Sequence, residues 1–333
     1  MEEAIKPPKL KEGDTVGIIA PASSASLIRK ENLEMAAKTL KAFKIKTKYG
    51  RNIFKKYSIS SLGIKEKLQD IHDMFLNREI KAIMAVIGGY TSNQLIPYLD
   101  YKLIEGNPKI LIGYSDITAL QNAIFAKTGM ITFSGPCFAT LAQTQEPFSF
   151  EKKYFKKILI DGESDIEVKE SKFWSDDEWW KMPNKKRELK KNTGWKIIKK
   201  GGATGTIVGG NLSTILLLLG TPYCPNFENK ILFIEEGPEM NLGMVERMLF
   251  QLKQAEIFSQ IKGLIIGRFD SKTNLTGKDE KELIEGAMKD YKIPVIFNVD
   301  FGHTSPMITF PIGGNCEIDT DKKLIKFVGT QVA

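Results

Sequence analysis

The stretch that most constrains the fold is Pro108–Thr118, where an apolar run turns into a helix with almost no loop between them. Ile110–Ile112 predicts a buried strand and Asp116–Lys127 predicts a helix, which leaves a turn of three residues that ends in Ser115. So abrupt a reversal places one side chain at the strand's carboxyl end, beside the unpaired N–H groups and partial positive charge of the helix N-terminus. A serine there has the surroundings of a nucleophile elbow. The simpler explanation is that Ser115 or Asp116 caps the helix.

The first half of the chain repeats this strand-to-helix pattern. Four apolar strands each end in small or polar residues, and helices follow them. The other predicted strands are Thr15–Ala20, Ile80–Ile87 and Ile131–Pro136, and the other predicted helices are Leu27–Phe43, Ile64–Asn77 and Asn93–Leu99. Because all the polar loops follow the carboxyl ends of the strands, residues 1–150 are predicted to form an open parallel α/β sheet, Rossmann- or flavodoxin-like, with a cleft at that edge. No G-x-G-x-x-G is present, so this is not a dinucleotide fingerprint.

Residues 201–333 carry an α/β pattern of their own, which predicts a smaller C-terminal α/β domain with the active site at the interface of the two domains. Its predicted strands are Gly205–Val208, Lys230–Ile234, Gly263–Ile266 and Pro294–Asn298, with helices up to Leu219, at Met244–Gln254 and at Asp279–Lys289, and a terminal hairpin within Cys316–Phe327.

Residues 151–200 are predicted to link the two domains. A helix at Phe148–Ile160 leads to a long polar stretch, Lys172–Asn192, which holds Trp174, Trp179 and Trp180. Long segments of this kind are lids, binding loops or disordered. Since disordered segments are poor in aromatic residues, we interpret this one as a binding loop.

Bulk composition excludes several classes of protein. No apolar run reaches eighteen residues, and the N-terminus lacks the apolar core of a signal peptide, so we expect a cytoplasmic protein with no membrane partner. Three widely spaced cysteines suggest neither disulfides nor a zinc site, and no metal or other cofactor is predicted. Much of the net charge of +8 lies in 181–200, which has no nucleic-acid-binding motif, so we expect a solvated surface and no nucleic-acid partner.

The residues suited to acid–base chemistry are few. Only two histidines exist: His72 lies on a predicted helix, whereas His303 follows a glycine in a loop just past a strand. Glu235 and Glu236 end a buried strand, which is unusual because unpaired carboxylates avoid apolar surroundings. Ser115, Glu235 and His303 therefore make a candidate nucleophile, orienting acid and base. Glu236 could replace Glu235 if one of the pair is exposed.

Paired glycines follow another of the predicted strands. Gly88 and Gly89, just before Tyr90, would let the backbone approach a ligand or point its N–H groups inward. Their alternative role is a tight turn. These side chains could equally be loop and cap residues of a nucleotide- or sugar-binding protein, and the turn at Ser115 lacks the second glycine of G-x-S-x-G, so the usual α/β-hydrolase elbow is excluded.

Together the motifs resemble the LD-carboxypeptidase and microcin-immunity family of serine peptidases over nearly the whole chain. The segments that carry the resemblance are Gly17–Ala22, Ile87–Tyr90, Gly113–Asp116, Gly209–Leu212, Leu232–Glu236 and Phe301–His303. The resemblance implies a triad split between two domains, with Ser115 as nucleophile, His303 as base and Glu235 as its orienter. It further implies an oxyanion hole made by the N–H groups of Gly89 and Asp116. With Ser115 as the nucleophile, Asp116 is then the residue expected to cap the helix. The resemblance also implies a homodimer.

Within the family, the chain resembles the microcin-immunity branch more than the murein branch. Murein enzymes tend to have an arginine, suited to a substrate carboxylate, where this chain has Ile87. The similarity continues through Ser92–Leu95 and the tryptophan-bearing loop, where an aromatic side chain stacks on adenine. Trp180 matches that position best, with Trp174 and Trp179 as substitutes; lid packing or a dimer contact would also explain them. With Gly88, Tyr90 and Asn211, Trp180 makes up the predicted substrate-binding set.

The resulting prediction is a serine carboxypeptidase or amidohydrolase whose small-molecule substrate is a peptidyl- or aminoacyl-nucleotide, and which gives resistance to microcin-like toxins. The alternative enzyme is a carboxypeptidase that trims murein tetrapeptides during wall recycling. A protein that only binds a nucleotide-like ligand, without chemistry, is the alternative of another class.

Overall fold

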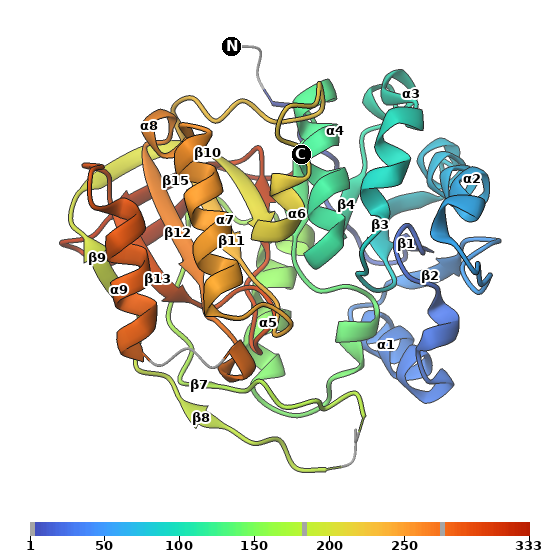
Figure 1. The fold of residues 1–333 in the computed structure, drawn as a ribbon. Coiled ribbons are helices and arrows are strands. Elements are labelled where there is room, and N and C mark those ends of the chain that lie inside the picture. Colours follow the sequence, from blue (N-terminus) through green and yellow to red (C-terminus); the bar gives the residue numbers. More distant parts are fainter. Residues whose placement is uncertain (1–3, 182–184, 274–276) are drawn as a thin grey trace.

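Two sheets lie side by side in the computed structural model, which describes residues 4–181, 185–273 and 277–333 (Figure 1). The first sheet has six strands in the order β14-β5-β4-β3-β1-β2. Its strands are β1 (Thr15–Ile19), β2 (Lys46–Tyr49), β3 (Ile80–Ala85), β4 (Ile110–Gly113), β5 (Thr132–Ser134) and β14 (Phe310–Ile312). All neighbours pair in parallel except β14, which is antiparallel to β5. The predicted parallel sheet of the first half is confirmed.

Two strands of this sheet were missed by the sequence analysis. β2 is a polar edge strand in which no residue is buried, so it lacks the apolar signal of its neighbours. β14 comes from the far end of the chain and covers the opposite edge of the sheet. From β1 the chain moves to β2 on one side and then returns to β3 on the other, so the order of the strands reverses between β1 and β3.

The second sheet has eight strands in the order β6-β16-β15-β10-β11-β12-β13-β9. These are β6 (Ile166–Glu167), β9 (Lys196–Lys199), β10 (Gly202–Asn211), β11 (Lys230–Glu235), β12 (Gly263–Gly267), β13 (Val295–Val299), β15 (Asn315–Asp319) and β16 (Leu324–Val328). The four central strands, β10 to β13, are parallel, and antiparallel strands flank them on both sides. The predicted second α/β region and its terminal hairpin, β15–β16, are confirmed.

Nine α-helices are found in the described part of the chain. They are α1 (Lys30–Ala42), α2 (Ile64–Leu76), α3 (Tyr101–Glu105), α4 (Thr118–Thr128), α5 (Phe148–Lys156), α6 (Leu212–Leu216), α7 (Leu242–Gln254), α8 (Ile257–Gln260) and α9 (Gly277–Met288). The predicted helix at Asn93–Leu99 is a 3-10 helix, Ser92–Tyr98, with a proline inside it, and α5 continues into a π-helical turn, Lys157–Asp161.

Helix α4 joins the two halves. It lies between the sheets, next to α6, in Figure 1. Residues on every face of α4 are buried, from Thr118 to Ile124, so it has no solvent-facing side over that length. A helix buried all round is a core element, which makes α4 a rigid support for the turn that precedes it.

The tryptophan-bearing segment is anchored at both ends. β7 (Phe173–Trp174) pairs with β8 (Lys190–Lys191), and Ser175 forms a two-way backbone bridge with Ser305. The predicted loop Lys172–Asn192 is therefore closed by a short hairpin; its residues 182–184 lie outside the described ones. In Figure 1 this segment runs along the bottom of the molecule, below both sheets.

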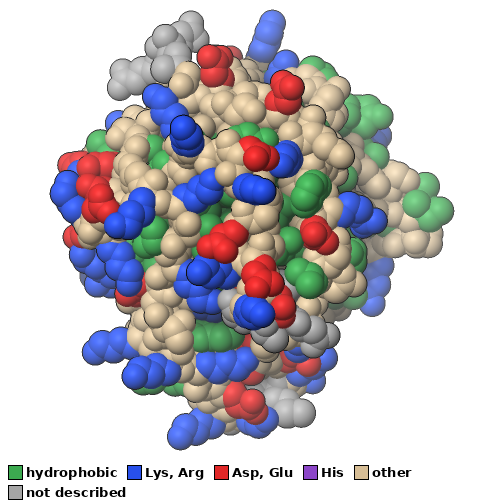
Figure 2. Space-filling model, turned by 60° about the vertical axis from the view of Figure 1, so that its left-hand side comes forward, with side chains coloured by type: hydrophobic (Ala, Val, Ile, Leu, Met, Phe, Trp, Pro, Cys, Tyr) green, Lys and Arg blue, Asp and Glu red, His purple; other side chains and the backbone are tan. Residues whose placement is uncertain are grey.

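The surface mixes charges of both signs. On the face seen in Figure 2, lysine and arginine side chains are interspersed with aspartate and glutamate. Within the described residues, no helix has the length and apolar character needed to cross a membrane.

Candidate active site

Ser115 sits on a turn as tight as the sequence predicts. Only Tyr114 separates β4 from a 3-10 turn, Ser115–Ile117, that runs directly into α4. The φ angle of Ser115 is +61°, a left-handed value that is uncommon for a residue other than glycine. Such a backbone conformation costs on the order of 1–3 kcal/mol and persists only where its surroundings hold it.

The predicted helix cap is wrong for both candidates, because neither Ser115 nor Asp116 makes a side-chain cap bond to its own helix. The buried Asp116 carboxylate instead accepts the N–H groups of Thr91 (2.9 Å) and Ser92 (2.8 Å). Ser92 Oγ donates in return to the Asp116 carbonyl at 2.5 Å. Asp116 thus caps the neighbouring 3-10 helix and ties the turn to the loop after β3. Burial raises the pKa of Asp116, and these hydrogen bonds and the charge of Lys67 oppose that rise.

Three predicted residues meet within hydrogen-bond distance. His303 Nε2 lies 3.1 Å from Ser115 Oγ, and His303 Nδ1 lies 2.7 Å from Glu235 Oε2. The Glu235 side chain is 4% exposed and that of His303 is 17% exposed, so the carboxylate is shielded while part of the imidazole is accessible. A nucleophile bonded to a base that is itself bonded to a carboxylate is the arrangement used in acyl transfer.

Burial and nearby carboxylates act in opposite directions on the pKa of His303. Burial alone lowers the pKa of His303, but the charge and hydrogen bond of Glu235, helped by the charges of Glu239 and Glu236, raise it to about 9. The carboxylates therefore stabilise the imidazolium form, which a general base becomes once it has taken a proton.

Glu235 and Glu236 are both buried, so the expectation that one of them is exposed is wrong. The two side chains point to different partners from the end of β11. Glu236 accepts from Asn211 Nδ2 (2.9 Å), from the N–H of Ser213 (2.8 Å) and from the N–H of Gly237 (2.9 Å), and has no contact with His303. Burial raises the pKa of Glu236, as does the charge of Glu235. In this geometry the acid that faces His303 is Glu235.

The paired glycines leave space next to Ser115. A Cβ on Gly88 would lie 3.0 Å from the Cβ of Ser115, 3.1 Å from its Oγ and 3.7 Å from the nitrogen of Asp116. A side chain there would occupy the space above the nucleophile. A Cβ on Gly89 would lie 2.6 Å from Ser23 Oγ, since this residue touches the loop after β1. The Gly89 N–H has no protein acceptor among the described residues, which leaves it available to a substrate oxygen.

The loop that carries His303 is held by contacts that the sequence analysis did not identify. Gly302, at φ +101°, lets the loop approach Glu235, because a Cβ there would come within 2.5 Å of Oε2. The Tyr114 ring packs edge-on against His303 at 5.3 Å. At the start of the loop, Asp300 binds Arg268 (2.7 Å) and the backbone of Ser171 (2.8 Å).

A second set of missed residues links the halves of the site. Asn122 on α4 donates to the Gly209 carbonyl (2.8 Å) and accepts the Gly209 N–H (3.0 Å), and Thr118 Oγ1 accepts the N–H of Asn211 (2.9 Å). These bonds join the helix behind Ser115 to β10, the neighbour of the strand that ends in Glu235. Polar residues buried together on α4, Thr118 and Asn122 one helical turn apart with Gln121 beside them, were the available signal.

The predicted substrate-binding residues lie in different surroundings. The Asn211 side chain is buried; its oxygen accepts from Ser213 and Thr214 and its nitrogen donates to Glu236, so it orders the loop around Glu236. Tyr90 is 76% exposed and free to contact a ligand.

The three tryptophans of the segment also differ in how much of each ring is exposed and in what it contacts. Trp180 is 46% exposed and packs edge-on against Trp179 at 6.1 Å, and Trp179 is half-buried. Trp174 is already in contact with two cations, Lys190 Nζ at 4.6 Å and Arg268 Cζ at 5.0 Å from its ring centre. Trp180 is therefore the tryptophan of this segment with the most surface to offer a ligand. In the described part of the chain, no cluster of three or more His, Cys, Asp or Glu side chains could hold a metal ion.

Comparison with known families and proteins gives consistent results. The LD-carboxypeptidase N-terminal domain matches residues 16–135, and the LD-carboxypeptidase C-terminal domain matches residues 204–318. A putative carboxypeptidase of Bacillus subtilis, YocD, is 39% identical over 93% of this chain and 95% of its own length. The microcin C7 self-immunity protein MccF of Escherichia coli is 33% identical over 95% and 93%. A probable murein peptide carboxypeptidase of Bacillus subtilis is 32% identical over 96% and 92%.

Solved structures agree with the fold over almost the whole chain. An MccF-like protein from Bacillus anthracis superposes with a TM-score of 0.93 and 39% identity, covering 98% of this chain and 100% of that one. MccF determined in complex with aspartyl sulfamoyl adenosine superposes with a TM-score of 0.91 and 31% identity, covering 99% and 100%.

Proposed function

The chain belongs to the LD-carboxypeptidase family of serine peptidases, and we propose that it cleaves amide or related acyl bonds through Ser115, His303 and Glu235. The observation that carries this proposal is the continuous contact from Ser115 Oγ through the His303 ring to Glu235 Oε2, at 3.1 Å and 2.7 Å. Glu235 and His303, from the second half of the chain, thus form one line of hydrogen bonds with Ser115 from the first half.

The chemistry follows from these contacts. His303 Nε2 takes the proton of Ser115 as Oγ attacks the carbonyl carbon, and Glu235 stabilises the imidazolium that forms. The N–H groups of Gly89 and Asp116 donate to the developing oxyanion, in the space that Gly88 leaves open. His303 then returns the proton to the leaving group, and water, activated in the same way, hydrolyses the acyl-serine.

The proposed substrate class is a peptidyl- or aminoacyl-nucleotide, and the activity would give resistance to microcin-like toxins. Two observations support this class. Ile87 supplies no charge for a free carboxylate next to the paired glycines, and Trp180 offers an exposed ring in a segment anchored beside the His303 loop. The similar MccF is known in complex with an aminoacyl-sulfamoyl nucleoside, which is an analogue of that substrate class.

Trimming of murein tetrapeptides is the second candidate. It is supported by the probable murein peptide carboxypeptidase of Bacillus subtilis, which is 32% identical to this chain, against 33% for MccF. A third candidate, binding of a nucleotide-like ligand without chemistry, is excluded if Ser115 forms an acyl intermediate.

The test is hydrolysis of both substrates by one preparation. Purified protein is incubated separately with aspartyl sulfamoyl adenosine and with a murein tetrapeptide, and the released amino acid is measured. We expect turnover of the nucleoside substrate and its loss, by about 10⁶-fold, in Ser115→Ala. Turnover of the tetrapeptide alone would reject the proposed substrate class. An alanine variant as active as the parent would reject the triad.

The role of Trp180 can be separated from the chemistry. Trp180→Ala should raise KM for the nucleoside substrate by about 10- to 100-fold, the value of one base stack, and leave kcat nearly unchanged. Trp179→Ala is the matched control, since that ring is half-buried against the core. An equal loss for peptide and nucleoside substrates would assign Trp180 to packing instead.

The proposal also includes a homodimer in the cytoplasm and a resistance phenotype. Light scattering on the purified chain measures the oligomeric state, fractionation of the host cell gives the location, and the growth of toxin-treated cells expressing the chain or its Ser115→Ala variant tests resistance.

A further inference from the structure

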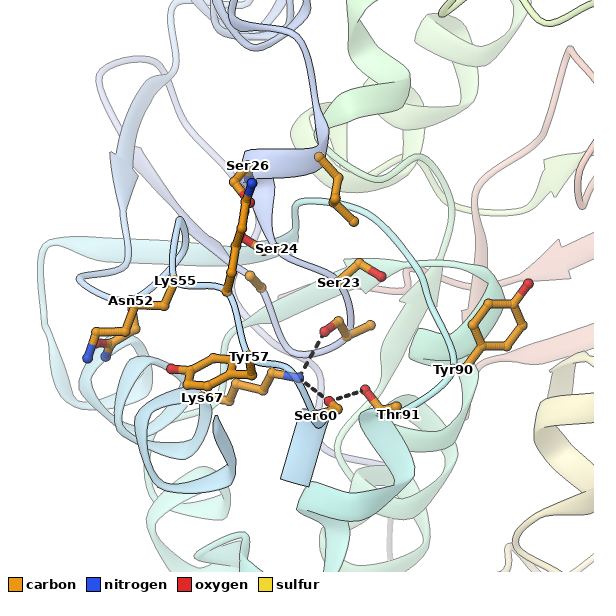
Figure 3. A pocket seen from close by; sticks show the side chains of 14 residues that line it. Ser23, Ser24, Ser26, Asn52, Lys55, Tyr57, Ser60, Lys67, Tyr90 and Thr91 are labelled. Carbon is orange, nitrogen blue, oxygen red and sulfur yellow. Dashed lines mark hydrogen bonds between the residues drawn. The ribbon is translucent and has the colours of Figure 1, made fainter. Parts of the chain in front are cut away.

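A hollow of about 310 Å³ opens at the carboxyl edge of the first sheet (Figure 3). It is bounded by the loop after β1, the loop after β3 and the segment from β2 to α2. Its lining includes three lysines, Lys55, Lys56 and Lys67, and no aspartate or glutamate. Its walls include Tyr57 and Tyr90. A hollow whose charged lining residues are all cationic favours an anionic ligand.

The pocket lies at the place where open α/β sheets usually bind ligands. The order of strands in the first sheet reverses between β1 and β3, and the loops that follow these two strands both line the pocket. Crevices at such a reversal, at the carboxyl ends of the strands, are the general ligand sites of doubly wound folds. The Ser115 turn follows β4, one strand further along the same edge.

Lys67 is the unusual residue of the pocket, because its side chain is buried without a counter-ion. It is 9% exposed, and its Nζ donates to the Ala22 carbonyl (2.9 Å) and to Ser60 Oγ (2.8 Å). Figure 3 shows the second of these bonds continuing from Ser60 to Thr91. An ammonium has three donors, so one remains. Both hydrogen bonds of Lys67 within the described residues thus go to neutral groups, and it forms no ion pair there.

The nearest compensating charge is already engaged. Asp116 acts on Lys67 through its charge, but its carboxylate is bonded to the N–H groups of Thr91 and Ser92. Burial accordingly lowers the pKa of Lys67, and Asp116 offsets this only in part. A buried cation without a partner is costly unless an anion joins it.

Another buried lysine shows what a purely structural role looks like. Lys109 is 8% exposed and donates to the carbonyls of Met74 (2.8 Å) and Asn77 (2.5 Å), and it does not line the pocket. The two lysines are alike in burial and in bonding, and differ in whether their surroundings include a hollow.

We propose that this pocket binds a small molecule through a terminal oxyanion, a phosphate or a carboxylate, that pairs with the ammonium of Lys67. Lys56, which is exposed on the lining, adds attraction for an anion, whereas Lys55 is partly compensated by Glu66 at 3.8 Å. The pocket adjoins the Ser115 turn, because Tyr90 and Thr91 of its lining follow Gly89 and Thr91 donates to Asp116, but Ser115 itself does not line it and the proposal does not depend on the function proposed above.

The experiment titrates the full chain with inorganic phosphate and, separately, with acetate, by isothermal titration calorimetry. The parent and Lys109→Met should show saturable binding of one anion. Lys67→Met should bind that anion with an affinity at least about tenfold lower, because one charged hydrogen bond is lost. Tighter binding of phosphate identifies a phosphate ligand, and tighter binding of acetate a carboxylate ligand. Equal affinity in Lys67→Met and Lys109→Met, or no saturable binding of either anion by the parent, overturns the proposal.

A surface pair keeps the test decisive if Lys67→Met does not fold. Lys56→Glu reverses a lining charge on an exposed residue, and Lys38→Glu makes the same change on the exposed side of α1, outside the pocket. We expect several-fold weaker anion binding in Lys56→Glu only. Equal weakening in both variants would reflect net charge and would reject the site.

Discussion

Ser115 reaches the reaction centre on a turn of its own sheet, whereas Glu235 reaches it from the end of β11 and His303 from a loop 68 residues further along the chain. The first side is built locally: one strand, one linking residue and one buried helix determine where the serine points. The second side is assembled from remote contacts, through Gly302, Asp300 and the bridge between Ser175 and Ser305. The position of Ser115 therefore depends on a short stretch of backbone, whereas the positions of Glu235 and His303 depend on contacts between distant residues. Substitutions on the two sides should accordingly have different effects on activity and stability.

Among variants that keep the Ser115 nucleophile, the largest effect should come from the second side. Glu235→Gln removes the charge that supports the His303 imidazolium and allows the wrong tautomer, so kcat should fall by about 10⁴, as in other serine triads. Glu236→Gln is the matched control, because this neighbour is equally buried but faces Asn211. Its kcat should stay within about tenfold of the parent. Similar losses in both variants would mean that burial of the pair, not contact with His303, matters.

The first side should be sensitive to crowding. Gly88→Ala places a methyl group 3.0 Å from the Cβ of Ser115, in the space for the substrate carbonyl, so kcat/KM should fall by about 10² with little change in melting temperature. Gly286→Ala is the control, since nothing lies within 4 Å of a Cβ there. A Gly88→Ala variant with full activity would show that the substrate does not use this space.

The link between the two sides should be weaker but measurable. Asn122→Ala removes both bonds to Gly209 and leaves two buried backbone groups unpaired, at a cost of about 1–3 kcal/mol in the free energy of unfolding. Urea unfolding gives the stability, and kcat reports the alignment of the triad. Asn107→Ala, whose amide bonds only within its own turn to Leu103, should change neither; if both variants behave alike, α4 does not couple the sides.

The smallest perturbation is a titration of the unmodified protein. With only two histidines, NMR can follow each: His303 should titrate at about 9, and His72 below its usual value, because burial lowers the pKa of His72 despite the charges of Asp100 and Asp73. As the base must be neutral, kcat/KM should be highest above the His303 pKa and fall as the pH drops through it. The pKa of His303 should decrease in Glu235→Gln; an unchanged value would contradict its assignment to that carboxylate.

The sequence identified the polar residues of the site but not all of their roles. Glu235 ends β11 and His303 follows β13, and the carboxyl ends of parallel strands meet at one edge of a sheet, so the proximity of these two was predictable. Ser115 follows a strand of the other sheet, so its contact with His303 was implied by the family resemblance rather than by the strand pattern. That Asp116 does not cap its own helix was not predictable, because the N–H groups that donate to its carboxylate belong to a loop 24 and 25 residues away. Nor was the burial of both Glu235 and Glu236, which depends on partners that α6 supplies for the second carboxylate.

Local pattern therefore determined the parallel sheets, the tight turn at Ser115 and the two carboxylates at the end of β11, because apolar periodicity and small residues act over short stretches of chain. Only the tertiary structure decided which carboxylate faces His303, how Asn122 joins the halves and that Lys67 is buried beside a hollow. These depend on residues between 25 and 188 positions apart in the chain, whose contacts no local pattern records.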